Sequence, residues 1–194
     1  MNVAIVKYNA GNTASVANAL RRLGVEPRIT DDAERLRSAD KVIFPGVGEA
    51  STAMEYLRER GLDDVVRSLT QPVLGVCLGM QLLCASSEEN ETECLGLLPY
   101  RVGRFQSGPL KVPHMGWNSL TDLRGPLFDG VAEGTHVYFV HGYRVEAGVH
   151  TTAACEYGTP FSAALSHANF HAVQFHTEKS GPAGERILEN FLKL

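Results

Sequence analysis

The sequence has no long hydrophobic run and no excess of positive charge. No stretch of its 194 residues approaches the roughly 20 apolar residues that a membrane-spanning helix needs. The apolar run near the start, at residues 3–6, is also too short for the core of a signal peptide. The formal net charge of −4 gives no sign of the basic footprint of a nucleic-acid-binding protein. We therefore expect a chain that binds neither membrane nor nucleic acid.

Disulfide and metal motifs are also missing from the sequence. The four cysteines contain no Cys-x-x-Cys pair and lie among apolar residues. This pattern is typical of free thiols in a reducing cytoplasm rather than of a disulfide framework or a zinc site. The histidines include no His-Glu-x-x-His motif, and His114, His141 and His176 lie far apart in the sequence. We therefore expect a cytoplasmic protein with no metal and no cofactor.

The composition is that of a globular protein, with 44% hydrophobic and 21% charged residues, and the length suits one domain spanning residues 1–194. The first half alternates extended and helical patterns, whereas short β-like runs broken by glycine follow from residue 96 to about 176. The sequence therefore predicts an α/β fold with a mostly parallel central sheet, flanking helices and additional antiparallel strands in the second half. The expected strands are 2–7, 25–29, 41–48 and 72–77, and the expected helices are 13–23, 50–60, 62–69, 78–86 and 184–194.

The segment GVCLG, at residues 75–79, places a cysteine where an apolar run ends and a helical run begins. This is the Gly-x-nucleophile-x-Gly pattern, in which a sharp strand-to-helix turn holds the nucleophile and small flanking residues let the backbone pass closely. The helix N-terminus would stabilise the thiolate of Cys77, and the amide of Leu78 would point to where an oxyanion forms. Cys77 is therefore the candidate nucleophile. The alternative is that Cys77 is a buried structural cysteine in an ordinary turn. The other three cysteines are expected to be structural and buried.

A base for this thiol is expected in the segment AVQFHTEKS, at residues 172–180. The alternation of Val173 and Phe175 with polar residues predicts an extended segment, in which His176 and Glu178 project to the same side. The carboxylate can then accept from the far nitrogen of the imidazole, fix its tautomer and stabilise the imidazolium. This pattern indicates a Cys-His-Glu triad with His176 as base and then acid, although a His-x-Glu pair alone is more often a solvent-exposed strand end.

Several segments together resemble the class I (triad) glutamine amidotransferases. More narrowly, they resemble the glutaminase subunits of imidazole glycerol phosphate synthases, from histidine biosynthesis. The segments GVCLGMQLL and QFHTEKS are similar to the nucleophile and histidine–glutamate motifs of the class, and YNAGNTASVANAL and FPGVGEA to its N-terminal segment and oxyanion strand. The pairing of PHMGWN with YFVHGY is what selects the subfamily. The resemblance spans nearly the whole chain and implies a flavodoxin-like α/β domain.

The resemblance implies catalytic roles for the matched positions. Cys77, His176 and Glu178 would form the triad. The amides of Leu78 and Val47 would form the oxyanion hole, the second only after a peptide in the PGVG segment flips, which its glycines permit. Thr177, between the triad histidine and glutamate, stands where the family usually has proline, and we expect little catalytic consequence because its side chain should point the other way.

The resemblance also implies a binding site for the substrate glutamine. Gln81 lies one helical turn after the nucleophile and would hold the α-amino-acid end, unless it is a solvent-exposed helix residue. Glu89 would pair with the ammonium group, although its neighbour Glu88 and a plain surface charge run stay open as alternatives. Relatives often carry serine or threonine at the position of Gly142, so main-chain groups must serve there. The residues implied to bind glutamine are Gly48, Gln81, Glu89, Gly142 and Tyr143.

The implied activity is hydrolysis of glutamine to glutamate and ammonia. The ammonia would pass to a cyclase subunit with a (β/α)8 barrel fold, in a heterodimer with this chain, that makes imidazole glycerol phosphate and an aminoimidazole carboxamide ribotide. Without the resemblance, Trp117 would be read as a core anchor and residues 138–140 as a buried strand. Two other functions stay open: a stand-alone cysteine hydrolase of γ-glutamyl compounds, and a catalytically silent regulatory subunit. The residues expected to face the partner are Pro113, His114, Met115, Trp117, Asn118, Tyr138 and Lys179.

Overall fold

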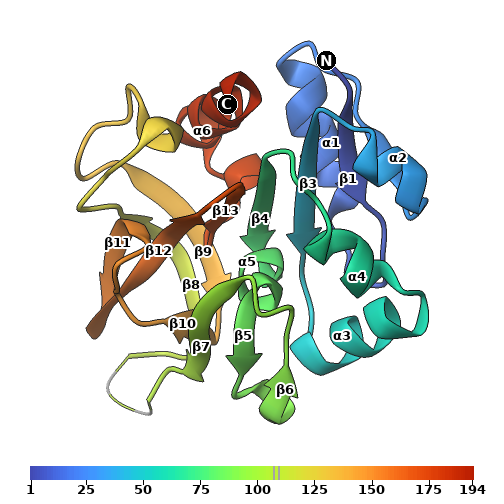
Figure 1. Cartoon of the computed structure of the whole chain (residues 1–194). Coiled ribbons are helices and arrows are strands. Elements are labelled where there is room, and N and C mark those ends of the chain that lie inside the picture. Colours follow the sequence, from blue (N-terminus) through green and yellow to red (C-terminus); the bar gives the residue numbers. More distant parts are fainter. Residues whose placement is uncertain (107, 109) are drawn as a thin grey trace.

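The computed structural model of the chain describes residues 1–106, 108 and 110–194 (Figure 1). Its helices are α1 Thr13–Arg22, α2 Ala33–Arg37, α3 Ala50–Glu59, α4 Leu62–Arg67, α5 Leu78–Leu83 and α6 Gly181–Lys193, with short 3-10 turns η1 Glu89–Glu91, η2 Pro126–Phe128 and η3 Thr177–Lys179. Its strands are β1 Val3–Val6, β2 Arg28–Thr30, β3 Lys41–Gly46, β4 Val73–Cys77, β5 Cys84–Ser87, β6 Thr92–Glu93, β7 Leu98–Arg104, β8 His114–Ser119, β9 His136–His141, β10 Tyr143–Val145, β11 Thr151–Tyr157, β12 Thr159–His167 and β13 Phe170–Val173.

A seven-stranded sheet forms the centre of the chain, with the strand order β11-β12-β13-β4-β3-β1-β2. The strands from β13 to β2 run parallel, whereas β12 and β11 pair antiparallel at the opposite edge. Two smaller sheets, β10-β7-β5-β6 and the hairpin β8-β9, are built from the middle of the chain. The α/β fold predicted from the sequence, with a mostly parallel sheet and antiparallel strands in the second half, is confirmed.

Helices cover both faces of this sheet, so its parallel strands are buried on both sides. Successive residues of β1 join different cores. Val3 and Ile5 pack with residues of α1 and α6, whereas Ala4 and Val6 pack with residues of α3, α4 and α5. The carboxyl ends of the parallel strands β3, β4 and β13 are thereby fixed side by side between two layers of helices, and the candidate nucleophile lies at the end of β4.

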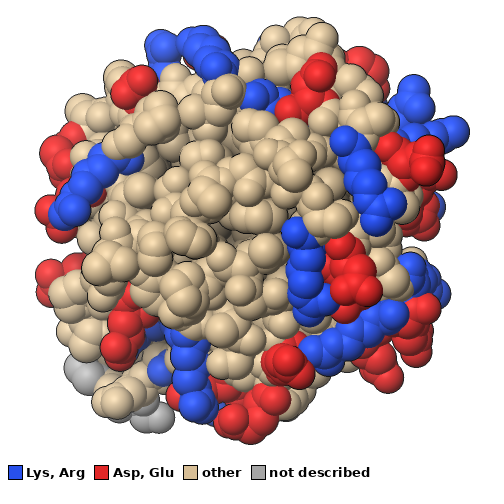
Figure 2. Space-filling view, viewed as in Figure 1, with Lys and Arg blue, Asp and Glu red and all other residues tan. Residues whose placement is uncertain are grey.

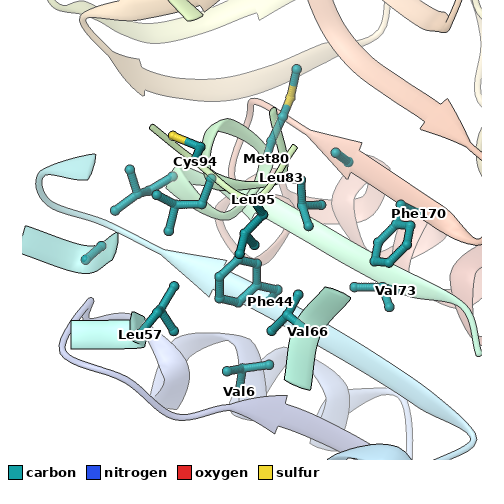
Figure 3. Packing of buried hydrophobic residues seen from close by; sticks show 14 of the residues in the cluster. Val6, Phe44, Leu57, Val66, Val73, Met80, Leu83, Cys94, Leu95 and Phe170 are labelled. Carbon is teal, nitrogen blue, oxygen red and sulfur yellow. The ribbon is translucent and has the colours of Figure 1, made fainter. Parts of the chain in front are cut away.

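Phe44 of β3 lies at the centre of the core that contains Ala4 and Val6 (Figure 3). Its side chain is fully buried with Leu57 of α3, Val66 of α4 and Leu95 of the loop after β6. Burying an aromatic side chain of this size contributes about 1.5–3 kcal/mol. This packing holds β3 in place directly before the PGVG segment, which is the candidate oxyanion segment.

The predicted helix at residues 78–86 is too long. The helix α5 ends at Leu83, and Cys84 adopts an extended conformation with ψ 175°. Cys84 then begins β5, which pairs parallel with β7 and antiparallel with β6. The prediction failed because the backbone partners of β5 come from strands later in the chain, and periodicity within one segment carries no information about them.

Two other helices also differ from the sequence-based prediction. The short helix α2 was not predicted because Leu36 is its one buried residue and no periodic pattern results. Asp32 caps it by accepting a hydrogen bond from the amide of Arg35. The last helix begins at Gly181 instead of residue 184, because Pro182 suits the first turn of a helix.

Charged side chains of both signs lie mainly around the edge of the face shown in Figure 2 and leave its centre largely uncharged. This face therefore presents no broad area of a single charge, in keeping with the net charge of −4. Within the described residues, no helix combines the length and the apolar character that crossing a bilayer requires.

Candidate active site

The thiol of Cys77 lies at the turn between β4 and α5. Cys77 has φ 55° and ψ −110°, a conformation that costs a residue other than glycine of the order of 1–3 kcal/mol. The two flanking glycines explain how the turn fits. A Cβ atom on Gly79 would lie 1.8 Å from the carbonyl oxygen of Phe44, and one on Gly75 would lie 2.7 Å from the side chain of Leu83. The sequence therefore spaces its glycines where α5 packs directly on the backbone of the sheet.

His176 and Glu178 approach this thiol from the end of β13. Nδ1 of His176 lies 2.7 Å from Oε1 of Glu178, and the two side chains are 2% and 0% exposed. Because an ionised carboxylate only accepts, Nδ1 carries the proton and the Nε2 atom is left to bond elsewhere. The imidazole and Cys77 line the same cavity, and they are close enough for Cys77 to raise the pKa of His176. The three side chains therefore meet in the order that a nucleophile, a base and an orienting carboxylate require.

The hydrogen bonds within this triad shift the pKa values of its members. Burial acts to lower the pKa of His176, but its interactions with Cys77 and Glu178 outweigh this effect and raise the pKa to about 10. Burial acts to raise the pKa of Glu178, yet the hydrogen bond and charge of His176, together with a hydrogen bond from Asn12, hold it below its ordinary value. The site therefore favours a charged carboxylate beside an imidazolium.

The prediction that residues 172–180 form one extended segment is wrong. The strand β13 ends at Val173, and Glu178 lies in the 3-10 turn η3. The pair meets because His176 is still extended, at φ −88° and ψ 101°, and the following tight turn brings the carboxylate back to the ring. The buried hydroxyl of Thr177 has no hydrogen-bond partner among the described residues, so it forms no hydrogen bond with either triad side chain.

Two residues of the N-terminal segment join the site without having been singled out from the sequence. Asn12 donates from Nδ2 to Oε1 of Glu178, and it adopts a left-handed conformation with φ 82° directly before α1. Tyr8 is buried and donates its hydroxyl to the carbonyl oxygen of Pro45 at 2.7 Å. The Gly-Asn step before a helix was the available signal for Asn12, since asparagine tolerates this conformation better than most residues. The hydrogen bonds of Asn12 to Glu178 and of Tyr8 to Pro45 could not be predicted from the spacing of these residues in the sequence.

Most of the predicted site residues line a cavity of about 410 Å³. Its volume falls in the range of small-molecule sites, roughly 300–1,000 Å³. Glu178 lies behind His176 and does not line it. Among the described residues, no three histidine, cysteine or acidic side chains are placed to hold a metal ion. The predicted residues that line the cavity are Val47, Gly48, Cys77, Leu78, Gln81, Glu89, Pro113, Gly142, Tyr143, His176 and Lys179.

Gln81 lines the cavity with its amide held in a fixed direction. Its Nε2 atom donates to the carbonyl oxygen of Tyr143 at 3.3 Å and to Oε1 of Gln174 at 3.0 Å. The side chain is 5% exposed, so it is not the solvent-exposed helix residue that was the alternative. Since both hydrogens of Nε2 are engaged, the Oε1 atom is the group left to accept a hydrogen bond from a bound molecule.

Glu89 and Glu88 occupy different places. Glu89 lines the cavity and accepts the amide of Ala50 at 2.7 Å, and burial is the main cause that raises its pKa. Glu88 is exposed and pairs with Arg101 at 3.5 Å, beside a larger hollow of about 720 Å³ that contains none of the predicted catalytic residues. Of the two carboxylates, Glu89 is therefore the one placed to meet a ligand in the cavity.

The hairpin β8-β9 presents an exposed aromatic and apolar surface next to the cavity. Met115 is 63% and Trp117 56% exposed, and Trp117 packs edge to face on Tyr138 at 5.9 Å between ring centroids. Lys179 lies above the ring of Tyr138 and lines the cavity as well. Trp117 is therefore not the core anchor that was its alternative interpretation.

His114, which was expected to face the partner, is buried. Strand alternation explains the difference, because the neighbours of His114 along β8 point outward while its own side chain points inward. Its imidazole stacks between Phe139 and Tyr157, at 4.8 and 4.0 Å between centroids, and Nδ1 lies 3.0 Å from Nε2 of His141. Burial lowers the pKa of His114 to about 4 and is the main cause that lowers that of His141 to about 3.

We expect this buried histidine pair to make the protein sensitive to acid. Both pKa values lie below that of an unfolded histidine, near 6.5, so the unfolded chain binds more protons between about pH 4 and 6.5. Each histidine therefore lowers the free energy of unfolding by about 1.4 kcal/mol per pH unit as the pH falls through this window. Urea unfolding between pH 4.5 and 6.5 measures the slope.

A matched pair of variants isolates this contribution. His114→Asn removes one titrating group and should reduce the slope of unfolding free energy against pH by about one proton. His136→Asn removes an exposed histidine from the neighbouring strand and should leave the slope as in the unmodified protein. Equal slopes in all three proteins would show that His114 is not kept neutral by the fold.

The fold and this site together define an α/β enzyme with a cysteine nucleophile, because the strand-to-helix turn, the imidazole and the orienting carboxylate are the parts that acyl transfer needs. A family model described as "Glutamine amidotransferase class-I" matches residues 4–194. The chain belongs to this family.

Curated relatives and solved structures agree with this assignment. The chain is 56% identical to imidazole glycerol phosphate synthase subunit HisH of Bacteroides fragilis, with 100% of both chains covered. It is 45% identical to the protein of the same name from Escherichia coli, again over 100% of both. A crystal structure of a glutamine amidotransferase is 23% identical, with 100% of this chain and 98% of the other covered, and its TM-score of 0.78 shows the shared fold.

Proposed function

We propose that this chain is the glutamine-hydrolysing subunit of an imidazole glycerol phosphate synthase in histidine biosynthesis. The observation that carries the proposal is the placement of Cys77 and His176 on the wall of one cavity, with Glu178 behind the histidine. The whole-length similarity to subunits of that name supports the choice of reaction. We further propose that residues 1–194 act as one glutamine amidotransferase domain in the cytoplasm, where the four free, buried thiols would be stable.

The first half of the reaction forms a thioester. The thiolate of Cys77 attacks the side-chain amide carbon of glutamine, and the negative charge moves to the amide oxygen. The amide of Leu78, at the first position of α5, stabilises this oxyanion together with that of Val47, whose segment lines the cavity and turns at Gly48 with φ 116°. The carbon–nitrogen bond then breaks as His176 gives its proton to the leaving nitrogen, which departs as ammonia.

The second half releases glutamate. His176, now neutral, takes a proton from water, and the hydroxide attacks the thioester carbon and displaces the thiolate. Glu178 accepts from Nδ1 throughout and stabilises the imidazolium that forms in each half. Gln81 and Glu89 hold the α-amino-acid end of the substrate, because the free Oε1 of Gln81 and the carboxylate of Glu89 are both acceptors for an ammonium group.

The ammonia is passed to a cyclase subunit. Free ammonia would be protonated in bulk water and lose its nucleophilicity, so a closed passage between the subunits is needed. The relatives are named as subunits, which favours such a partner over a stand-alone hydrolase. We propose that the partner is a (β/α)8 barrel that forms a heterodimer with this chain and makes imidazole glycerol phosphate and the ribotide.

The partner-facing surface is proposed to lie on the hairpin beside the cavity. Exposed methionine and tryptophan together with tyrosine are typical of interface cores. His114 supports this surface from beneath instead of contacting the partner, because its side chain is buried. The residues proposed to contact the partner are Pro113, Met115, Trp117, Asn118, Tyr138 and Lys179.

The test compares glutamine hydrolysis in three states of the protein. We propose that the oxyanion segment rests unflipped in the isolated chain, which should then be nearly inactive. Addition of a purified cyclase subunit should raise the rate, and addition of the nucleotide substrate of the cyclase should raise it further, by at least about tenfold, the size of a 1.4 kcal/mol coupling. Glutamate release is the measurement. Equal rates in all three states would refute the coupling of hydrolysis to the partner.

A further inference from the structure

Gln174 touches the nucleophile but has no role in the mechanism above. Its side chain is fully buried, and its Nε2 atom lies 3.8 Å from Sγ of Cys77. A hydrogen bond to sulfur is longer than one to oxygen, so this distance is within reach. Burying an amide without hydrogen bonds costs free energy, so each end of this side chain requires a partner. The question is which end of the amide faces the sulfur.

The orientation of the Gln174 amide is set by the backbone carbonyl of Tyr143, which acts through the side chain of Gln81. The oxygen of Tyr143 only accepts, so Gln81 must present its Nε2 to it, at 3.3 Å. The same Nε2 donates to Oε1 of Gln174 at 3.0 Å. A reversed Gln174 amide would set two N–H groups against each other. Gln174 therefore turns its oxygen to Gln81 and its N–H groups to Cys77.

A second chain of hydrogen bonds fixes the same carbonyl from the other side. Nδ1 of His141 lies 2.7 Å from the oxygen of Tyr143 and must donate to it. The Nε2 of His141 is then an acceptor, to which the Nδ1–H group of His114 donates a hydrogen bond at 3.0 Å. The low pKa values of both histidines keep them neutral and preserve this pattern. The carbonyl from which Gln174 takes its direction is therefore held on both of its acceptor sites.

Loss of the thiol proton changes which neighbouring groups can form a hydrogen bond with the sulfur. The carbonyl oxygen of Val140 lies 3.7 Å from Sγ and can accept from a thiol, but it offers nothing to an anion. An N–H group gains in the same step, because a hydrogen bond to a charged acceptor is roughly twice as strong as one between neutral groups. We propose that Gln174 donates a hydrogen bond to the Cys77 thiolate and is a further catalytic residue of this site. The inference rests on the proposed function only for its part in glutamine turnover.

Two substitutions separate this role from a structural one. Gln174→Met keeps the volume but removes every polar atom, whereas Gln174→Glu keeps an acceptor for Gln81 and removes the N–H donor. The decisive readout is the rate at which iodoacetamide alkylates Cys77 at pH 7, followed by peptide mass spectrometry. Loss of the donor should slow this rate about 10- to 100-fold in both variants. In the complex with the cyclase subunit, kcat of Gln174→Glu for glutamine should fall by a similar factor, with KM changed less than threefold because the acceptor for Gln81 is kept.

A merely structural role predicts a different pattern. If Gln174 serves only to hold Gln81, Gln174→Met should raise KM for glutamine and leave the alkylation rate of Cys77 unchanged. That result would overturn the proposal. Gln71→Met is the matched control, since Gln71 donates to the carbonyl of Leu36 far from the site. Alkylation within twofold of the unmodified rate is expected for it.

The readouts keep the inference separate from the proposed function. Iodoacetamide needs no glutamine and no partner, so the alkylation rate tests the donor even if the unmodified complex were to hydrolyse no glutamine. That second failure would overturn the proposed function alone. Circular dichroism and the unfolding temperature show whether each variant is folded, and if the methionine variant is not, the near-isosteric glutamate variant carries the test.

Discussion

Cys77→Ala should abolish glutamine hydrolysis while leaving ammonia-dependent synthesis intact. Without the sulfur there is no thioester, and the loss of a covalent nucleophile costs roughly 10⁴- to 10⁶-fold in kcat. The fold should survive, because alanine fits the left-handed turn no worse than cysteine does. In the complex with the cyclase subunit, product formation should stop with glutamine as nitrogen source and continue with an ammonium salt.

Cys155→Ala is the matched control for this experiment. Cys155 lies on β11, is 1% exposed and does not line the cavity, so its loss should leave glutamine-dependent synthesis close to that of the unmodified protein. The assignment of the nucleophile would be contradicted by a Cys77→Ala complex that still consumed glutamine at an appreciable rate. It would also be contradicted if both variants lost activity to the same extent.

Glu178→Gln should lower kcat by roughly 10³- to 10⁴-fold, the size of effect known when a catalytic histidine loses its orienting carboxylate. An amide can no longer stabilise the imidazolium, and it can hold the ring in the wrong tautomer. The KM for glutamine should change little, because Glu178 does not line the cavity. The substitution should also lower the pKa of His176, since the carboxylate is one of the groups that raise it.

The pH profile of the Glu178→Gln complex gives a second test of this role. A lower pKa for His176 means that the imidazolium is lost at lower pH, so the alkaline limb of kcat/KM should move toward neutral pH. Glu185→Gln is the control, because Glu185 pairs with Arg22 on the surface and should alter neither kcat nor the profile. An unchanged profile in the Glu178 variant would mean that the carboxylate does not act on the histidine.

Local patterns in the sequence were sufficient to predict the sheet and to single out the candidate nucleophile. The spacing of Gly75 and Gly79 around Cys77 is visible in five residues, although the atom that Gly79 must avoid, the carbonyl oxygen of Phe44, belongs to the neighbouring strand β3. The alternation of strand and helix likewise fixes a parallel sheet, because each crossover is built from neighbouring segments. His176 and Glu178 were also paired correctly, but for the wrong reason, since a tight turn and not a strand brings them together.

Long-range contacts were what the sequence could not supply. Asn12 contacts Glu178 from 166 residues away in the sequence and Gln174 contacts Cys77 from 97 residues away, and no spacing rule connects such positions. The strand β5 was mistaken for helix because its partners lie later in the chain. His114 was placed on the surface because its neighbours resemble a partner-facing motif, whereas strand alternation turns its own side chain into the core.

The most direct test of the proposed mechanism is to trap the covalent intermediate. The complex should be mixed with glutamine, quenched in acid during turnover and analysed by peptide mass spectrometry. We expect one glutamyl group on the peptide that carries Cys77, none in Cys77→Ala, and a larger fraction when His176→Asn slows the release of glutamate more than the attack. Steady turnover of glutamine with no adduct on Cys77, or with the adduct on another residue, would contradict the mechanism.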